Sequence, residues 1–462
     1  MIDFTIESSS FRDPSGFLFY QNNVLYRQIN KSYKENYNFL IKSGLYANLV
    51  EQELLIPHEE VVNESITNDG FIIIKPEKIP FISYPYEWSF SQLKDAALIT
   101  IEIQKIAKKY DMMLKDASAY NIQFKNGKPI FIDTLSFEKY VEGEPWKGYK
   151  QFCQHFFAPL ALMSKRDIRL GQLSRIYIDG IPLDLASDLL PMKTKTAFSL
   201  LSHIHAHAKS QKYYQGKKID MKKRKISSRS LEGVIESLHS GIKKMNWAEK
   251  ETEWGDYYSD TNYSDVSFEE KQKIILEFLK KHNPKQVWDL GSNTGIFSRI
   301  ASDLGIFTVS FDIDPLAVEK NYRESVEKQE TNILPLLLDL ANPSGDIGWS
   351  NNERLSLMKR GPVDLVMALA LIHHLVISNN IPLKKLANFF NKICNFLIIE
   401  FIPKTDSQVD RLLVTREDIF TDYTQENFEL EFKNYFTILK SIDIIDTKRT
   451  MYIMEKKERY EV

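Results

Sequence analysis

The C-terminal half of the chain alternates short apolar runs with amphipathic segments. Five runs are almost continuously apolar, at residues 286–290, 307–311, 333–338, 363–368 and 395–401. Such runs are typical of parallel strands whose two faces are both covered. The spacing of apolar residues between the runs predicts helices over 292–304, 316–327 and 383–392. Two later runs, at 435–444 and 450–457, predict a closing antiparallel pair, so we expect a doubly wound α/β sheet of seven strands.

The N-terminal half mixes strand and helix patterns without that regular alternation. Residues 16–29 predict a hairpin, residues 70–88 a strand followed by a connecting segment, and Asn126-Gly127 the turn of a second hairpin. Stretches at 91–110 and 147–164 predict helices. We therefore expect a separate α+β domain.

One strong change of composition separates the two halves. Between Lys209 and Arg229 nine Lys or Arg residues face a single Asp. Such a run cannot bury an apolar face, which predicts a solvated linker or an exposed helix, with contact to a polyanion as the alternative. The predicted organisation is an N-terminal domain at 1–207, a basic connecting segment at 208–250 and a C-terminal domain at 251–462.

The composition excludes several classes of protein. The 462 residues carry a net charge of −2, which argues against binding of nucleic acid by the whole molecule. Cys153 and Cys394 are the two cysteines, far apart and without metal-ligand spacing, so neither a disulfide scaffold nor a cysteine-based zinc site is expected. No signal peptide and no apolar run long enough to span a membrane is evident, so we expect a cytoplasmic protein.

Candidate ligand-binding residues follow the predicted strands, because ligands of doubly wound sheets bind beyond the carboxyl ends of the strands. The first strand leads into Asp289-Leu290-Gly291-Ser292-Asn293-Thr294-Gly295, a turn with two glycines. The second ends at Asp312, about 20 residues further on, where a carboxylate can accept both hydroxyls of a ribose. Asp339 follows the third strand and Ala368 ends the fourth.

The ordered set resembles the class I S-adenosylmethionine-dependent methyltransferases. "VWDLGSNTGIFS" is similar to their first motif, "VSFDIDPLAVEKN" to the second, "LLLDLAN" to the third and "VDLVMALALIHHL" to the fourth, over roughly residues 254–456. The resemblance implies that S-adenosylmethionine is bound by Asp289, Gly291, Ser292, Asn293, Gly295, Asp312, Ile313, Asp339, Leu340 and Ala368, with Tyr263 in a covering segment. Asn293 stands where the family has glycine, and asparagine tolerates positive φ well.

A dinucleotide-dependent oxidoreductase is the competing interpretation of the glycine turn. Its motif favours a third glycine for helix packing, and Ser298 stands at that place. Methyl transfer requires alignment of a nucleophile with the sulfonium methyl, and a general base helps when the acceptor is a hydroxyl. His373 and His374 after the fourth strand, and Glu400 in the fifth, are the candidate catalytic residues, and packing or helix capping is their alternative role.

Three polar residues of the N-terminal half have a spacing that is typical of a nucleotide- and metal-binding site. Asp116, Asn121 and Asp133 resemble the catalytic loop and the metal-binding aspartate of kinases, which implies ATP and magnesium. Lys115 and Thr134-Leu135 depart from the usual neighbours of these residues, and Arg27 stands where a phosphate-binding lysine is expected. Turn and cap chemistry is the alternative reading of the three polar residues. The resemblance thus implies a degenerate kinase-like domain.

The two resemblances together define the functional hypotheses. A kinase-like part beside a methyltransferase resembles bifunctional enzymes that modify glycan ends, and bacterial methyltransferases of nodulation and surface-glycan loci. We expect a methyltransferase that acts on a small-molecule or saccharide-like acceptor at oxygen, with an N-terminal domain that binds acceptor or partner. The alternatives are a bifunctional enzyme that also uses ATP and magnesium, and a non-catalytic cofactor-binding scaffold.

Overall fold

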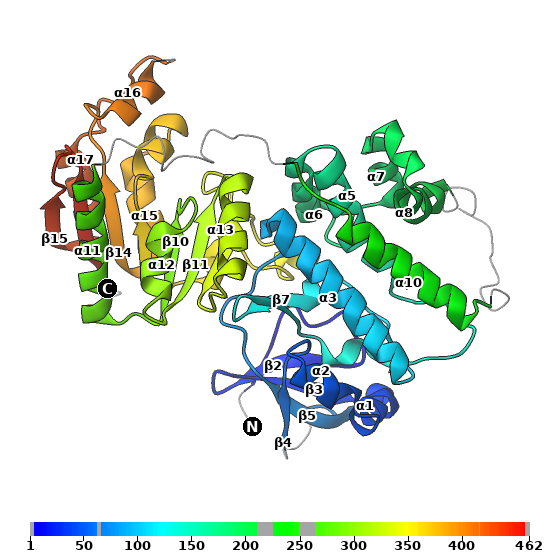
Figure 1. Ribbon diagram of the computed structural model, residues 1–462. Helices are drawn as coiled ribbons and strands as arrows, with labels where there is room; N and C mark the ends of the chain where they lie inside the picture. The colour runs from blue at the N-terminus through cyan, green and yellow to red at the C-terminus, as the bar shows by residue number, and fades with distance from the viewer. Residues whose placement is uncertain (1–3, 62–65, 210–224, 249–263, 415, 458–462) are drawn as a thin grey trace. The chain divides into compact units, whose positions relative to one another are not determined.

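A computed structural model describes residues 4–61, 66–209, 225–248, 264–414 and 416–457 (Figure 1). The chain forms two compact units. The N-terminal unit comprises Met1–Ala248 together with Asp346–Arg354, and the C-terminal unit comprises Glu249–Gly345 together with Leu355–Val462. A short segment from the second half of the chain therefore belongs to the first unit.

The C-terminal unit is built on a sheet of seven strands in the order β12-β11-β10-β13-β14-β16-β15. The strands are β10 (Gln286–Leu290), β11 (Phe307–Asp312), β12 (Ile333–Leu337), β13 (Val363–Ala368), β14 (Cys394–Phe401), β15 (Phe436–Asp443) and β16 (Thr450–Lys456). The first five pair in parallel, and β16 pairs antiparallel with both β14 and β15. This confirms the predicted seven strands and the closing hairpin.

Helices connect the strands of this sheet, and three of them correspond to the predictions at 292–304, 316–327 and 383–392. The helices are α11 (Asp265–His282), α12 (Ile296–Ser302), α13 (Pro315–Glu327), α14 (Leu357–Arg360), α15 (Leu383–Ile393), α16 (Ser407–Leu413) and α17 (Gln425–Lys433), with a π-helical turn η12 (His374–Ser378). A core cluster joins apolar residues of α11 and α12 to one face of β10, β13, β14 and β16. The sheet is thus held by burial of the apolar runs from which it was predicted.

The first predicted helix begins four residues later than expected. Its start was predicted at Ser292, and the structure places it at Ile296. The reason is backbone conformation, because Gly291, Asn293 and Gly295 all have positive φ, which an α-helix excludes. The next helix begins as predicted around Pro315, where the Asp314 side chain accepts the backbone N–H of Leu316.

The N-terminal unit is α+β, as predicted. Its main sheet is antiparallel in the order β1-β2-β3-β5-β4, and two two-stranded antiparallel sheets, β6-β9 and the hairpin β7-β8, are separate from it. The strands are β1 (Thr5–Ile6), β2 (Gly16–Gln21), β3 (Val24–Asn30), β4 (His58–Val61), β5 (Gly70–Pro76), β6 (Met112–Leu114), β7 (Ile122–Lys125), β8 (Lys128–Phe131) and β9 (Phe137–Lys139). The hairpin predicted around Asn126-Gly127 is β7-β8.

The longest helix of this unit, α3 (Phe90–Lys109), runs beside α10 (Ser228–Lys243) in Figure 1. Its start is fixed by a capping box in which the Ser89 and Gln92 side chains each accept the other's backbone N–H. The other α-helices among the described residues of this unit are α1 (Lys34–Lys42), α2 (Leu45–Glu51), α4 (Tyr149–Phe152), α5 (Ala158–Lys165), α6 (Leu173–Ile176), α7 (Leu183–Leu189) and α8 (Phe198–Leu200). Short 3-10 or π turns are η1 (Lys31–Tyr33), η2 (Pro85–Glu87), η3 (Ala119–Asn121), η4 (Thr134–Ser136), η5 (Cys153–Phe157), η6 (Ile168–Gln172), η7 (Met192–Thr196), η8 (Leu201–Ala206) and η11 (Trp349–Asn351).

The segment Asp346–Arg354 is fixed within the N-terminal unit by charged side chains. The Arg12 guanidinium donates to both carboxylate oxygens of Glu353, at 2.6 and 3.1 Å, and only 1% of the Glu353 side chain is exposed. The Arg354 guanidinium lies 4.0 Å from the centre of the Tyr120 ring. A paired buried carboxylate and a cation–π contact hold this segment in place.

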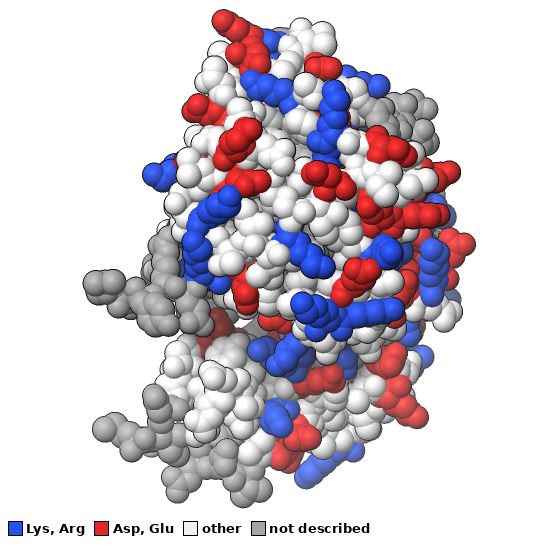
Figure 2. All heavy atoms as spheres, turned by 90° about the vertical axis from the view of Figure 1, so that its left-hand side faces the viewer, with Lys and Arg blue, Asp and Glu red and all other residues white. Residues whose placement is uncertain are grey.

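In the described parts of the chain, helices long and apolar enough to cross a membrane are absent. Figure 2 shows one face of the molecule, on which acidic and basic side chains are interspersed. This surface matches the near-neutral net charge of the sequence and offers no broad basic field on that face for a polyanion.

Candidate functional site

A cavity of about 360 Å³ lies in the C-terminal unit at the carboxyl ends of β10, β11, β12 and β13. Its size is within the range of small-molecule sites. The lining residues are Lys271, Asp289, Gly291, Ser292, Asn293, Phe297, Asp312, Ile313, Leu338, Asp339, Leu340, Ala341, Leu369, Ala370, Leu371, His374, Leu375, Ser378, Asn379 and Leu412. This is the edge of the sheet at which the sequence predicted a ligand.

The turn after β10 is shaped by three residues in the left-handed region. Gly291 has φ +77°, Asn293 φ +51° and Gly295 φ +81°. A Cβ atom at Gly295 would lie 2.5 Å from the Asn321 side chain, so glycine is required there by both conformation and space. Asn293 adopts the conformation that was predicted for it and caps the turn by accepting the Thr294 N–H at 2.9 Å.

Two buried carboxyls stand beside the turn. Asp312 accepts the backbone N–H of Asn293 at 2.7 Å on one oxygen and that of Asp314 at 2.8 Å on the other. Asp289 accepts the Ser298 hydroxyl at 2.6 Å. Burial raises the pKa of Asp289 to about 7 and that of Asp312 to about 6, because desolvation disfavours the charged forms. Both groups therefore titrate near neutral pH, as groups at functional sites often do.

Most of the residues predicted to bind the cofactor line the cavity. These are Asp289, Gly291, Ser292, Asn293, Asp312, Ile313, Asp339 and Leu340. Gly295 and Ala368 are not among the lining residues, and Ala368 is fully buried at the end of β13. Tyr263 lies outside the described residues.

The two candidate histidines are not equivalent. Their rings lie 4.0 Å apart between centres, but His374 lines the cavity and His373 does not. Burial lowers the pKa of His374 to about 4, and burial together with the neighbouring His374 holds the pKa of His373 well below its usual value. Both imidazole rings are therefore uncharged at neutral pH, and a neutral imidazole can accept a proton. Of the two, only His374 borders the cavity.

Glu400 lies behind the cavity wall and not in it. Its side chain is fully buried, and one oxygen accepts both the Lys271 ammonium at 2.8 Å and the backbone N–H of Ala370 at 2.9 Å. The other oxygen lies 3.8 Å from the Arg449 guanidinium. A carboxylate held this way is suited to positioning its neighbours, and it has no access to a substrate proton in this arrangement.

Several lining residues were missed at the sequence level. Three of them, Leu371, Leu375 and Ser378, lie with His374 at the i, i+3, i+4, i+7 spacing of one helical face. This spacing is a sequence signal that would have grouped them with His374. Lys271, on α11, and Leu412, on α16, reach the cavity from elements far from any motif. Their presence there depends on tertiary packing.

The polar residues predicted in the N-terminal unit lie near one another but are engaged with protein groups. The Arg27 guanidinium donates to Asp133, which also accepts the Ser136 hydroxyl and the Leu135 N–H. The Asn121 amide donates to the Ser136 hydroxyl at 3.2 Å. Burial raises the pKa of Asp116, and the charge of Asp133 adds to that shift. For Asp133, burial opposes ionisation, but Arg27 and Ser136 outweigh it, so its pKa lies below the usual range.

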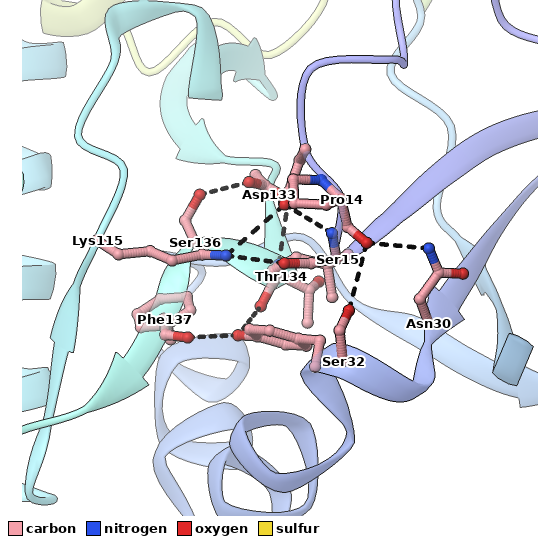
Figure 3. A network of polar contacts seen from close by, with 12 residues as sticks. Pro14, Ser15, Asn30, Ser32, Lys115, Asp133, Thr134, Ser136 and Phe137 are labelled. Carbon is pink, nitrogen blue, oxygen red and sulfur yellow. Dashed lines mark hydrogen bonds and ion pairs between the residues drawn. The ribbon is translucent and has the colours of Figure 1, made fainter. Parts of the chain in front are cut away.

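Figure 3 shows the polar network around this place. The Lys115 ammonium donates to the Ser15 hydroxyl at 2.9 Å and lies 3.7 Å from the Asp13 carboxylate. The Tyr33 hydroxyl donates to the carbonyl of Phe137 at 2.5 Å. Within the described ranges, His, Cys, Asp and Glu side chains form no group of three arranged to hold a metal ion.

The comparison with curated proteins gives a relative of nearly full length. The chain is 33% identical over 460 residues to the nodulation protein NoeA of Rhizobium meliloti (strain 1021), in an alignment that covers 98% of this chain and 96% of that protein. A scan against models of protein families gives no match.

Solved structures give more distant similarities. The bifunctional kinase-methyltransferase WbdD is 14% identical with a TM-score of 0.30, over 42% of this chain and 40% of that one. The magnesium protoporphyrin IX methyltransferase ChlM of Synechocystis PCC 6803, solved with bound SAH, is 15% identical with a TM-score of 0.32, over 44% and 93%. The N-methyltransferase NodS of Bradyrhizobium japonicum WM9 is 12% identical with a TM-score of 0.31, over 42% and 99%.

Proposed function

The chain belongs to the family of the nodulation protein NoeA, and we propose that it is a methyltransferase that binds S-adenosylmethionine in the cavity of its C-terminal unit. The observation that carries the proposal is the placement of Asp289, Asp312 and Asp339 at the ends of three adjacent strands around one cavity. The motif order that resembles the class I methyltransferases supports the same assignment.

The residues of the cavity fit the chemical groups of this cofactor. Asp312 lines the cavity, and its carboxylate oxygens have lone pairs beyond those used by the backbone N–H groups of Asn293 and Asp314, so it can accept the ribose hydroxyls. Asp339 and Leu340 would lie at the adenine, and the backbone of Gly291 at the methionine part. The cofactor supplies an activated methyl group when it is bound, so the protein need only align and desolvate the acceptor.

The remaining wall of the cavity defines the acceptor side. We assign the acceptor side to the part formed by Leu371, His374, Leu375, Ser378, Asn379 and Leu412, a mainly apolar surface with a few neutral polar groups. An uncharged acceptor that bears hydroxyl groups, such as a saccharide or another small molecule, suits such a surface. His374, uncharged at neutral pH, would accept the proton of the attacking hydroxyl, which supports transfer to oxygen.

For the N-terminal unit we propose a degenerate kinase-like fold that binds acceptor or partner. The contact between Arg27 and Asp133 favours this role over phosphotransfer, because a guanidinium competes for the carboxylate that the resemblance assigns to magnesium. A bifunctional enzyme would need this ion pair to open before ATP and magnesium could bind.

Titration calorimetry with S-adenosylhomocysteine tests the proposal for the C-terminal unit. We expect the wild-type protein to bind, and Asp312→Ala to weaken binding by about tenfold or more because a charge-assisted hydrogen bond to the ribose is lost. Asp303→Ala is the matched control, since Asp303 is exposed at the end of α12 and does not line the cavity. Absence of binding by a folded wild-type protein would refute the proposal.

A further inference from the structure

Lys271 is an unusual residue for a cavity wall. It lies on α11, only 1% of its side chain is exposed, and it borders the cavity together with Asp289 and Phe297. Its ammonium lies 5.0 Å from the centre of the Phe297 ring. A lysine is almost never buried so completely unless its ammonium is paired.

Glu400 fixes where this ammonium lies. The 2.8 Å ion pair joins α11 to β14, and the same carboxylate oxygen accepts the N–H of Ala370, a non-glycine residue with φ +47°. The nearby Arg449 is itself held by Asp406, at 2.7 and 3.1 Å, and is not a lining residue. Lys271 is therefore the cation of this network that borders the cavity.

Opposite charges thus border one part of the cavity. Asp289 and Lys271 are close enough for the Lys271 charge to act on the ionisation of Asp289. Lys271 contacts Glu400 of β14 and Phe297 of α12, whereas Asp312 and Asp339 follow β11 and β12, the two strands on the other side of β10. A zwitterionic amino-acid group, with an ammonium and a carboxylate on one carbon, complements such a pair of side chains.

We propose that Lys271 binds the carboxylate of the methionine part of the cofactor, while Asp289 faces its ammonium and Glu400 positions Lys271. The inference rests on the proposed function, and it assigns the methionine end of the ligand to α11, an element that carries none of the motifs. An ammonium has three N–H donors, so Lys271 can donate to Glu400 and to a ligand at once.

Two nucleosides that differ only at this end make the test. S-Adenosylhomocysteine carries the amino-acid group, and 5′-methylthioadenosine lacks it while retaining the adenosine and the thioether. Both are titrated by calorimetry into the wild-type full chain, Lys271→Met, the double variant Lys271→Met/Glu400→Gln, and Lys273→Met. Lys273 lies on the same helix with an exposed side chain and is the matched control.

The double variant guards against misfolding, because it leaves no uncompensated carboxylate behind the cavity wall. In both Lys271 variants the affinity for S-adenosylhomocysteine should fall roughly ten- to a hundredfold, as expected for loss of a charge-assisted contact. The affinity for 5′-methylthioadenosine should stay within about twofold. Because both ligands are titrated into the same sample, their ratio does not depend on the folded fraction.

The outcomes separate the inference from the function on which it rests. Equal losses for both nucleosides, or no loss for either, would overturn the assignment of Lys271. If neither Lys271 variant folds, Lys271→Arg is titrated instead; retained preference for S-adenosylhomocysteine supports the assignment, and lost preference overturns it. A folded wild-type protein that binds neither nucleoside would instead refute the proposed function.

Discussion

The backbone N–H of Asn293 donates to the Asp312 carboxylate over 2.7 Å, and Asn293 makes this contact with φ +51°. The loop after β10 and the acid that ends β11 are therefore one structural unit, in which the left-handed conformation of one residue presents its N–H to the other. Asparagine adopts this conformation more readily than other non-glycine residues do.

Substitution of Asn293 should separate conformation from side-chain chemistry. Asn293→Gly should leave the free energy of unfolding within about 0.5 kcal/mol, whereas Asn293→Val should cost about 1–2 kcal/mol, because a β-branched residue is strained at positive φ. Urea denaturation measures both. Equal stability of the Val and Gly variants would show that the left-handed turn is not needed in solution.

Cofactor affinity should depend on pH around neutrality. Burial raises the pKa of Asp289 to about 7 and that of Asp312 to about 6, so both carboxyls take up protons as the pH falls through this range. A bound ammonium favours the ionised carboxylate of Asp289, so binding of S-adenosylhomocysteine should release protons and weaken at acid pH. Calorimetry at about pH 6.5 in two buffers of different ionisation enthalpy measures the release. In Asp289→Asn the release should fall; an unchanged value would exclude Asp289 as its source.

The free energy of unfolding of the cofactor-free protein should also depend on the protonation of Asp289 and Asp312. It should fall as the pH rises, whereas the cofactor affinity should rise. The pKa values of both carboxyls in the folded state lie above the value of about 3.9 for an unfolded aspartate, so the folded state binds more protons than the unfolded state between about pH 4 and 7. These carboxyls consequently make the free protein less stable as the pH rises through that window, and bound cofactor should offset the effect.

The part of the fold that the sequence predicted is the part that depends on local pattern. Continuous apolar runs are long enough to be recognised without partners, and parallel strands place their carboxyl ends on one edge, so Asp289, Asp312 and Asp339 were predicted to come together. His373 and His374 were both predicted as candidates because they follow the fourth strand, but only the helical phase after β13 decides which ring borders the cavity.

The part that was not predicted depends on contacts between distant residues. Lys271 and Glu400 are 129 positions apart, and no pattern around either indicates an ion pair. Leu412 reaches the cavity from the stretch between β14 and β15, and Asp346–Arg354 leaves the C-terminal unit altogether. A long-range ion pair, or a short segment that packs in the other unit, leaves no periodic pattern in the sequence, so it is found only in the folded structure.

The ion pair between Arg27 and Asp133 should stabilise the N-terminal unit and exclude magnesium. Their side chains are 12% and 14% exposed, so Arg27→Met leaves a largely buried carboxylate without its guanidinium and should cost about 3 kcal/mol in urea denaturation. The double variant Arg27→Met/Asp133→Asn should recover part of that loss. ATP with magnesium should not raise the melting temperature of the wild type; a rise of about 2 °C or more that is lost in Asp133→Asn would instead favour a nucleotide site.

The ion pair between Arg12 and Glu353 should hold the segment Asp346–Arg354 in the N-terminal unit, so breaking it should lower the free energy of unfolding. The Glu353 side chain is 1% exposed and that of Arg12 is 52% exposed, so removing the arginine leaves a buried charge, whereas removing the glutamate leaves one in contact with solvent. Arg12→Ala leaves a buried carboxylate without its cation and should cost about 2–3 kcal/mol, whereas Glu353→Gln keeps a hydrogen-bonding group there and should cost about 1 kcal/mol. Glu327→Ala, at an exposed position of α13, is the matched control and should stay within about 0.5 kcal/mol of wild type. Urea denaturation of the full chain ranks the three variants, and a loss for Arg12→Ala no larger than for the control would show that the segment is not held by this ion pair.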